Sequence, residues 1–253
     1  MCGINGFNWK DSVTIQKMNN SITHRGPDHQ GFKSFKKASL GHTRLSVIDL
    51  SMQAAQPMTS PSSSLHITYN GEIYNFQELK KQYCQNKKFN SSSDTELILA
   101  MYELFGEDCV QYFKGMWSFV IYDEQKNIFF CSRDRLGIKP FHYYCQDNQF
   151  IFSSEIKSIL QHPITTQITP EAISSFLRYR YVLEEKTFFS GIYKLLPGHN
   201  LIYNLNNNTT QIKQYWDLEQ KETLGSFNEQ KDLTEKTLKQ SVDYRLIADV
   251  EIG

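Results

Sequence analysis

The sequence lacks the features of a membrane protein, of a disulfide-stapled secreted domain and of a zinc protein. No apolar stretch approaches the length of a membrane span, and the first residues show no charged-then-apolar signal segment. The five cysteines are odd in number and include no CxxC pair, so we expect reduced thiols in a cytoplasmic protein. Only Cys2 needs a special explanation. The other four are expected to pack in the interior: Cys84, Cys109, Cys131 and Cys145.

The chain also lacks an excess of charge of either sign. Its 27 basic and 27 acidic side chains cancel, which argues against nucleic acid or an anionic membrane surface as the main partner. With 253 residues, 40% of them hydrophobic, it can bury a core as one large domain or as one domain with an appendage. There is no internal repeat.

Short β-prone segments separated by Gly, Pro, Asn and Ser make up most of the chain. Residues 116–123 with 127–134, and 142–145 with 150–153, are predicted to form two hairpins. Near-continuous apolar strands with a few helices around them indicate two stacked antiparallel sheets whose outer faces are covered by helices.

Helices are predicted for 76–83 and from just after Pro170. A Ser-Asp-Thr-Glu pattern at 93–96 predicts a capping box, and the helix that it begins should end at Phe105, before Gly106.

The texture changes in the last fifty residues. An edge hairpin and a polar linker are expected between about 204 and 229, and a helix is expected over 232–246. Its apolar stripe has no partner in the remaining residues, so 206–253 is interpreted as a linker and the first helix of a truncated domain. The stripe consists of Leu233, Leu238, Val242 and Leu246.

Cys2 follows the initiator methionine directly. Removal of Met1 is favoured when the second residue is small, and the mature chain would then begin with a thiol and an α-amine on one residue. Such an amine titrates at about 7.7–8.0, so near neutrality part of it can accept the thiol proton. Position alone fits a chance cysteine in a disordered start as well. Together with the motifs further along the chain, it predicts an N-terminal nucleophile with its own base.

Further motifs follow Cys2 in a fixed order. Together they make the chain similar to class II glutamine amidotransferases, and most similar to the glutaminase domain of glutamine-hydrolysing asparagine synthetases of class B. The resemblance covers residues 2–200, and no single element of it would be specific alone. The motifs are Met-Cys-Gly-Ile at the start, His-Arg-Gly-Pro-Asp at 24–28, His-Thr-Arg-Leu-Ser-Val-Ile-Asp at 42–49, Asn-Gly-Glu-Ile-Tyr-Asn at 70–75, Ser-Asp-Thr-Glu at 93–96 and Arg-Asp-Arg-Leu-Gly-Ile-Lys-Pro at 133–140.

This resemblance implies an α+β fold of four layers, αββα, the N-terminal-nucleophile (Ntn) hydrolase sandwich, over a glutaminase domain at 2–205. It also implies that Cys2 attacks the side-chain amide of glutamine, forms a γ-glutamyl thioester and releases ammonia, after which water frees glutamate. Asn70 and Gly71 match the oxyanion hole, through a side-chain amide and a backbone N–H. Without this context, Asn-Gly would predict a type I′ hairpin turn.

The resemblance assigns the ends of glutamine as well. Arg44 matches the residue that binds the α-carboxylate through a planar fork, and Glu72 and Asp94 match those that bind the α-ammonium. A surface ion pair is the alternative for Arg44, and a favourable place at a helix N-terminus is the alternative for Asp94. Backbone contacts are expected from Val47 and Ile48. The segment after Arg44 completes the predicted glutamine site: Leu45, Ser46, Val47 and Ile48.

Two features receive no catalytic role from the sequence. His24, His29 and His42 fit no metal motif, so turn-stabilising or packed roles are expected and no metal site is predicted. The role of the segments 24–28 and 133–140 cannot be derived from their residues.

The ammonia acceptor stays open at this level. In asparagine synthetases it belongs to an ATP-pyrophosphatase domain with a Ser-Gly-Gly-x-Asp-Ser phosphate loop, and residues 247–253 resemble the segment just before that loop, which this sequence does not contain. ATP and Mg²⁺ are therefore expected only if such a domain follows; this chain itself should need no cofactor. The chain is interpreted as a truncated synthetase, or as a stand-alone glutaminase that serves a synthetase partner in trans, and a homodimer is not excluded.

Two alternatives come from other classes of function. One is a non-catalytic regulatory or scaffold relative, against which the intact Cys2, Arg44, Asn70 and Gly71 argue. The other is an amidotransferase that feeds a different acceptor, such as the carboxylate of a surface-polysaccharide sugar, a sugar phosphate or phosphoribosyl pyrophosphate.

Overall fold

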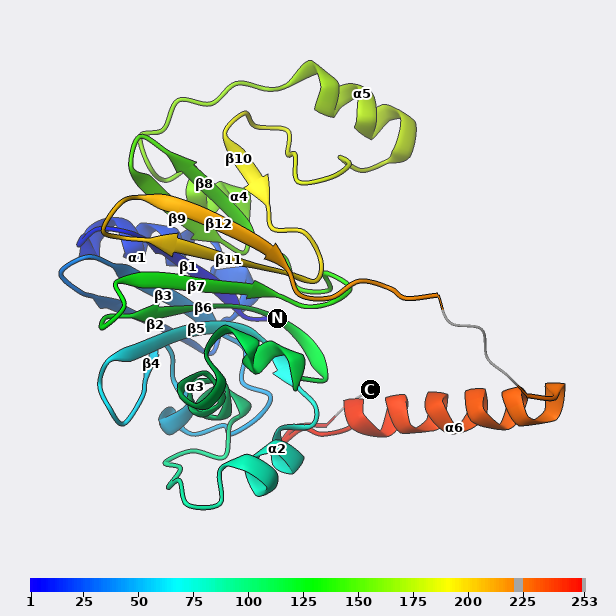
Figure 1. Ribbon diagram of the computed structural model, residues 1–253. Helices are drawn as coiled ribbons and strands as arrows, with labels where there is room; N and C mark the ends of the chain where they lie inside the picture. The colour runs from blue at the N-terminus through cyan, green and yellow to red at the C-terminus, as the bar shows by residue number, and fades with distance from the viewer. Residues whose placement is uncertain (221–224, 252–253) are drawn as a thin grey trace.

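Two antiparallel sheets of six strands each form the centre of the computed structural model, which describes residues 1–220 and 225–251 (Figure 1). The strands are β1 Gly3–Phe7, β2 His29–Ser34, β3 Ser39–Arg44, β4 Met58–Thr59, β5 Leu65–Ile73, β6 Gly115–Asp123, β7 Ile128–Arg133, β8 His142–Gln146, β9 Gln149–Ser153, β10 Ile192–Lys194, β11 His199–Asn204 and β12 Thr209–Gln214. Their order is β10-β8-β9-β1-β3-β2 in the first sheet and β12-β11-β7-β6-β5-β4 in the second. The predicted hairpins are confirmed as β6–β7 and β8–β9.

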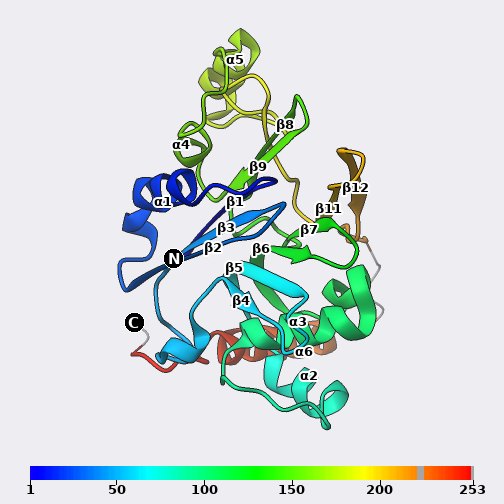
Figure 2. The same ribbon diagram turned by 90° about the vertical axis from the view of Figure 1, so that its left-hand side faces the viewer.

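Six helices are described, and the first four of them cover the outer faces of the sheets. They are α1 Ser12–Ser21, α2 Phe76–Tyr83, α3 Asp94–Phe105, α4 Ile156–Ile159, α5 Pro170–Tyr179 and α6 Phe227–Arg245, with 3₁₀ turns at Thr23–Arg25, Met52–Ala54 and Gly106–Gln111. The predicted α2, α3 and α5 are confirmed. Figures 1 and 2 show α1 and α4 on the side of the first sheet and α2 and α3 on the side of the second.

The alternation of side chains along β6 explains the layering. Phe119 and Ile121 point outward and pack with the buried residues of α3, whereas Val120 and Tyr122 point inward and pack in the cluster between the sheets. On the other side, Phe7 of β1 packs outward in a separate cluster with residues of α1 and α4. One apolar cluster thus lies between the two sheets, and one lies between each sheet and the helices on its outer face. The predicted αββα sandwich is confirmed.

One capping prediction is wrong. Ser93 is the N-cap residue of α3, but its side chain makes no capping hydrogen bond. Glu96 turns to the preceding loop instead, where its carboxylate accepts the N–H groups of Asn90 and Ser91 at 2.9 and 2.8 Å. These backbone donors compete with the N–H of Ser93, and the loop is ordered by the interaction.

A capping box does occur at the start of α6, where Ser226 and Glu229 hold each other's backbone N–H groups. The helix therefore begins at Phe227, five residues before the predicted start. It has no buried side chain, and its apolar stripe is 51–64% exposed. Residues 221–224 of the predicted linker, and Ile252 and Gly253 at the end, lie outside the described residues.

No helix in the described part of the chain has the length and apolarity that a membrane crossing needs.

Candidate active site

A cavity of about 230 Å³ opens where β1 begins and β3 ends, beside β5 and the first turn of α3. It suits a molecule of about the size of an amino acid, since drug-sized ligands occupy pockets of roughly 300–1,000 Å³. Of the predicted site residues, Ser46 alone does not line it. Those that do are Cys2, Arg44, Leu45, Val47, Ile48, Asn70, Gly71, Glu72 and Asp94.

Cys2 lies immediately before β1, and its thiol faces the segment after Arg44. The sulfur donates to the carbonyl of Leu45 at 3.5 Å and accepts the Leu45 N–H at 3.4 Å. Burial raises the pKa of the thiol, while the Leu45 hydrogen bond and the nearby positive charges lower it. A buried thiol of this kind needs both a base and cationic surroundings before it can act as a thiolate.

The His-Arg-Gly-Pro-Asp segment holds the backbone on both sides of the thiol. Arg25 donates from Nε to the Cys2 carbonyl at 2.9 Å and pairs with Glu155 at 3.0 Å. The carboxylate of Asp28 accepts the Ser46 N–H at 2.7 Å, which explains why Ser46 is held away from the cavity. At Gly26 a Cβ would lie 2.4 Å from the Thr43 carbonyl, so only glycine allows this close approach.

The histidines take structural positions. His24 is exposed and pairs with Glu155 at 2.9 Å, whereas His42 is buried with its ring nitrogen 3.0 Å from the Tyr69 carbonyl. Burial lowers the pKa of His42 to about 3, so the ring is neutral at physiological pH. No group of three metal-binding side chains comes together in residues 1–220 and 225–251.

Asn70 and Gly71 lie inside β5 rather than in a turn, opposite Ser118 and Trp117 of β6. The hairpin-turn reading is therefore excluded. The side chain of Asn70 is 1% exposed, and its Nδ2 has no hydrogen-bond partner among the described residues. A buried amide donor without a partner is costly, so its place in the wall of the cavity indicates a ligand that accepts from it. At Gly71 a Cβ would lie 2.2 Å from the Met116 carbonyl, which excludes any larger residue.

Arg44 ends β3 with its guanidinium at the edge of the cavity. It is 5% exposed and donates to the carbonyls of Ser51, at 2.8 Å, and Asp49. It makes no ion pair with a described residue, so the alternative of a surface ion pair is wrong. Because a guanidinium has five N–H donors, further donors remain for a carboxylate ligand.

The two predicted ammonium ligands have different surroundings. Asp94, the first residue of α3, is 4% exposed and accepts the Tyr69 hydroxyl at 2.7 Å and the Ile73 N–H at 2.8 Å. Burial nevertheless raises its pKa to about 6. Burial also raises the pKa of Glu72, and the positive charge of Lys139 opposes that shift. Neither carboxylate forms an ion pair within the described residues, so a cation entering the cavity would relieve both.

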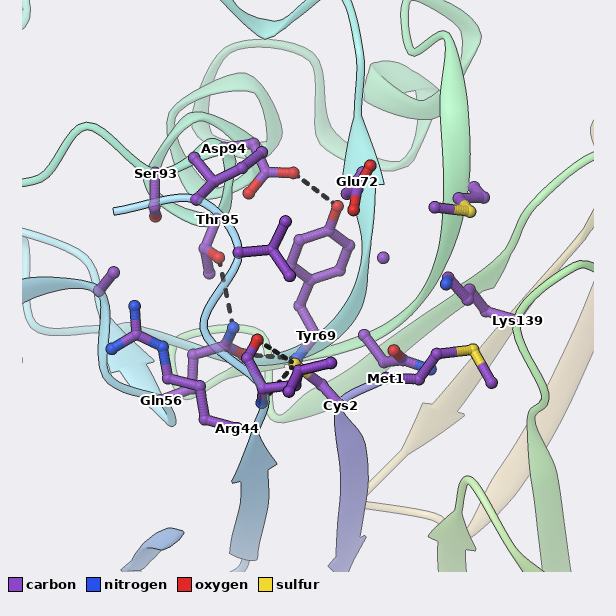
Figure 3. Close-up of a pocket in the computed structure, with 17 residues that line it drawn as sticks. Met1, Cys2, Arg44, Gln56, Tyr69, Glu72, Ser93, Asp94, Thr95 and Lys139 are labelled. Carbon is purple, nitrogen blue, oxygen red and sulfur yellow. Dashed lines mark hydrogen bonds between the residues drawn. The ribbon is translucent and has the colours of Figure 1, made fainter. Parts of the chain in front are cut away.

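Other residues of the cavity were missed by sequence reasoning. Gln56 joins two walls, since its Oε1 accepts the Tyr69 N–H at 2.7 Å and its Nε2 donates to the Thr95 hydroxyl at 3.3 Å (Figure 3). It stands in an irregular segment that carries no pattern. Lys139 also lines the cavity, although no role for its motif could be derived from the sequence.

Comparison with known proteins agrees with this geometry. Residues 1–216 match the family model described as a glutamine amidotransferase domain. The whole chain aligns at 37% identity with a putative asparagine synthetase [glutamine-hydrolyzing] 2 of Methanocaldococcus jannaschii, and the alignment covers 54% of that protein. It also aligns at 33% identity with asparagine synthetase [glutamine-hydrolyzing] 3 of Bacillus subtilis, and that alignment covers 42% of the relative. The chain thus spans about half the length of these relatives.

The fold has solved counterparts. A glutamine phosphoribosylpyrophosphate amidotransferase of B. subtilis superposes with a TM-score of 0.62 at 18% identity, over 85% of this chain and 49% of that one. At this identity the likeness speaks for the fold alone, an Ntn-hydrolase sandwich. The family match, the whole-chain relatives and the cavity around Cys2 lead to one assignment. This chain belongs to the class II glutamine amidotransferase family and is similar over its whole length to glutamine-hydrolysing asparagine synthetases.

Proposed function

We propose that this chain hydrolyses glutamine to glutamate and ammonia through Cys2. The thiolate attacks the carbon of the side-chain amide, and the α-amine of the mature N-terminus takes the thiol proton and passes it to the departing ammonia. A γ-glutamyl thioester remains, and water cleaves it to glutamate and restores the thiol.

The observation that carries this proposal is the unpaired Nδ2 of Asn70. It is a buried donor in the wall of the cavity that also holds the Cys2 sulfur, with the backbone of Gly71 beside it. An oxyanion that develops on the glutamine amide would receive both donors, and such stabilisation is typically the largest contribution to acyl-transfer catalysis. Arg44 at one end and the pair of Glu72 and Asp94 at the other would hold the charged groups of the amino acid.

A second hollow suggests where the ammonia goes. It has a volume of about 440 Å³ and shares Val47, Glu72 and Met116 with the cavity of Cys2. Its remaining walls are Tyr74 and the segment after α6, including Ile247 and Ala248. The names of the relatives support aspartate as the acceptor and asparagine as the product, formed with ATP and Mg²⁺ by a synthetase domain in the same or another chain. We also propose a cytoplasmic location, which the five free cysteines support.

The test is release of glutamate from glutamine by the purified chain and by its Cys2→Ala variant. Loss of the sulfur removes the nucleophile and little volume, so the variant should fold normally, release no glutamate and still bind glutamine. Cys145→Ala is the matched control, because this half-buried thiol on β8 lies outside the cavity and should be dispensable. Substantial release by Cys2→Ala would overturn the proposal.

A further inference from the structure

The Arg-Asp-Arg-Leu-Gly-Ile-Lys-Pro segment forms the loop between β7 and β8, and a single buried carboxylate organises it. Asp134 is 1% exposed. One of its oxygens accepts the N–H groups of Leu136 and Ile138, at 3.1 and 3.0 Å. The other accepts those of Lys139 and Trp117, at 3.0 and 3.2 Å. The loop is thereby tied to β6.

Arg133 fixes the same loop from its carbonyl side. Its guanidinium donates to the carbonyl of Lys139 at 2.8 Å, to that of Gly137 at 2.8 Å and to that of Leu195 at 2.6 Å. Both backbone groups of Lys139 are therefore held by side chains of its own motif, the buried Asp134 and the half-buried Arg133. An arrangement of this kind sets the direction of the one long side chain that leaves the loop toward the cavity.

The Lys139 side chain is 6% exposed and lines the cavity together with Cys2 and Glu72. Figure 3 shows it entering from the side opposite Arg44, with Cys2 between the two. Its ammonium makes no hydrogen bond or ion pair with any described residue. The residue as a whole is buried, but its ammonium keeps access to the cavity, so a positive charge without a partner among the described residues faces the space beside Cys2.

We propose that Lys139 is a positioning residue for glutamine hydrolysis, whose ammonium stabilises the thiolate of Cys2 and keeps the carboxylate of Glu72 ionised for the substrate ammonium. This inference rests on the proposed function. It gives the motif a purpose: Arg133 and Asp134 shape the loop so that the charge of Lys139 lies in the cavity without being neutralised there.

The charges around the cavity agree with this role. Lys139, Arg44 and the N-terminal amine each lower the pKa of the Cys2 thiol against the effect of burial. The hydroxyl of Tyr69 on β5 points away from the thiol and donates to Asp94 (Figure 3), and burial together with Asp94 keeps it protonated.

Lys139 itself experiences several charges. Burial lowers its pKa, Arg25 adds to this shift, and Glu72, Asp134 and the Cys2 thiolate oppose it.

The decisive variant is Lys139→Met, which keeps the length of the side chain and removes the charge. We expect the pH midpoint for alkylation of Cys2 by iodoacetamide, followed by mass spectrometry, to rise by about one pH unit. Near neutral pH this corresponds to about a tenfold loss in kcat/KM, and KM for glutamine should rise as well. The melting temperature should change little, because the ammonium makes no hydrogen bond or ion pair with a described residue that the variant could lose. Lys139→Arg should restore most of the midpoint.

Lys213→Gln on the exposed edge strand β12 is the control for loss of a positive charge, and its midpoint should not move. An unchanged midpoint in a folded Lys139→Met or Lys139→Gln protein would overturn the inference, as would a lower melting temperature with an unchanged midpoint. The alkylation midpoint can be measured without turnover. If the wild-type chain releases no glutamate, the proposed function fails. If the wild-type chain is active but the alkylation midpoint of the Lys139 variants does not shift, only the role of Lys139 is refuted.

Discussion

Under the proposed function, individual side chains in this cavity would separate the recognition of glutamine from the chemistry performed on it. Arg44 is fixed by two loop carbonyls and still has donors to offer, whereas Asn70 carries an amide that nothing in the described protein satisfies. A residue of the first kind should act on substrate and transition state alike, and one of the second kind mainly on the transition state.

This division predicts different kinetics for two variants. Arg44→Lys should raise KM for glutamine about tenfold to a hundredfold, because a point charge cannot reproduce a two-pronged contact. Asn70→Ala should instead lower kcat about a hundredfold to a thousandfold with a smaller change in KM. Steady-state kinetics of glutamate release measures both, and the reverse pattern would show that the two roles are assigned wrongly.

Asp94 links substrate binding to stability. Its pKa is raised from 3.8 to about 6, so the folded state binds a proton more readily than the unfolded state between those values. Stability from this group is therefore greatest at low pH and is lost as pH rises through about 6. Asp94→Asn should raise the free energy of unfolding at pH 8 by about 1–3 kcal/mol and weaken glutamine binding.

Thermal unfolding at pH 5 and pH 8, together with KM at pH 8, checks this prediction. The gain in stability should shrink toward pH 5, where the native carboxyl is largely protonated. A variant that is less stable at pH 8, or that keeps its KM, would contradict the trade-off.

At the scale of elements, α3 and α6 are opposites. From Asp94 to Tyr102, α3 is buried against the second sheet, whereas α6 has no buried residue. The end of the chain still reaches the site. Asp249 donates its N–H to the Val47 carbonyl at 2.9 Å, and its carboxylate accepts the Asp49 N–H at 2.7 Å.

Hydrogen exchange should therefore protect the amides of α6 much less than those of α3, since local opening of α6 breaks few buried contacts. Measurement of both helices in one experiment provides the internal comparison. Protection of the middle of α6 equal to that of α3 would mean that the exposed leucine stripe is covered in solution.

Sequence reasoning predicted the hairpins and four helices, α2, α3, α5 and most of α6, because their patterns are local. It missed α1, where Asp11 caps a helix with a weak apolar pattern, and it placed the capping box at Ser93 because the competing donors of the 90–91 loop are visible only in three dimensions. The cavity residues named in advance came from motifs. Gln56 could not be named, since its role depends on two distant segments that meet there.

At the scale of the whole molecule, residues 1–220 and 225–251 form no glycine-rich phosphate loop. Among the described helices, none begins in a glycine-rich loop after a strand, which is the arrangement that cradles phosphates. Calorimetry of this chain with ATP and Mg²⁺ should therefore detect no binding in the micromolar range. Binding of that strength would reveal an ATP site that the described residues do not explain.

The end of the predicted glutaminase domain at residue 205 stays a prediction. Strand β12 at 209–214 lies beyond it and pairs with β11 of the second sheet.

The most direct test of the account is whether activity requires Cys2 at the N-terminus. Met1 lines the cavity beside the thiol, and while it is present the α-amine belongs to the wrong residue. Intact-mass spectrometry gives the fraction of molecules that have lost Met1, and glutamate release can be measured on the same preparations. The account predicts that the rate of release is proportional to that fraction and extrapolates to zero when all molecules retain Met1. Full release by a preparation that retains Met1 would contradict it.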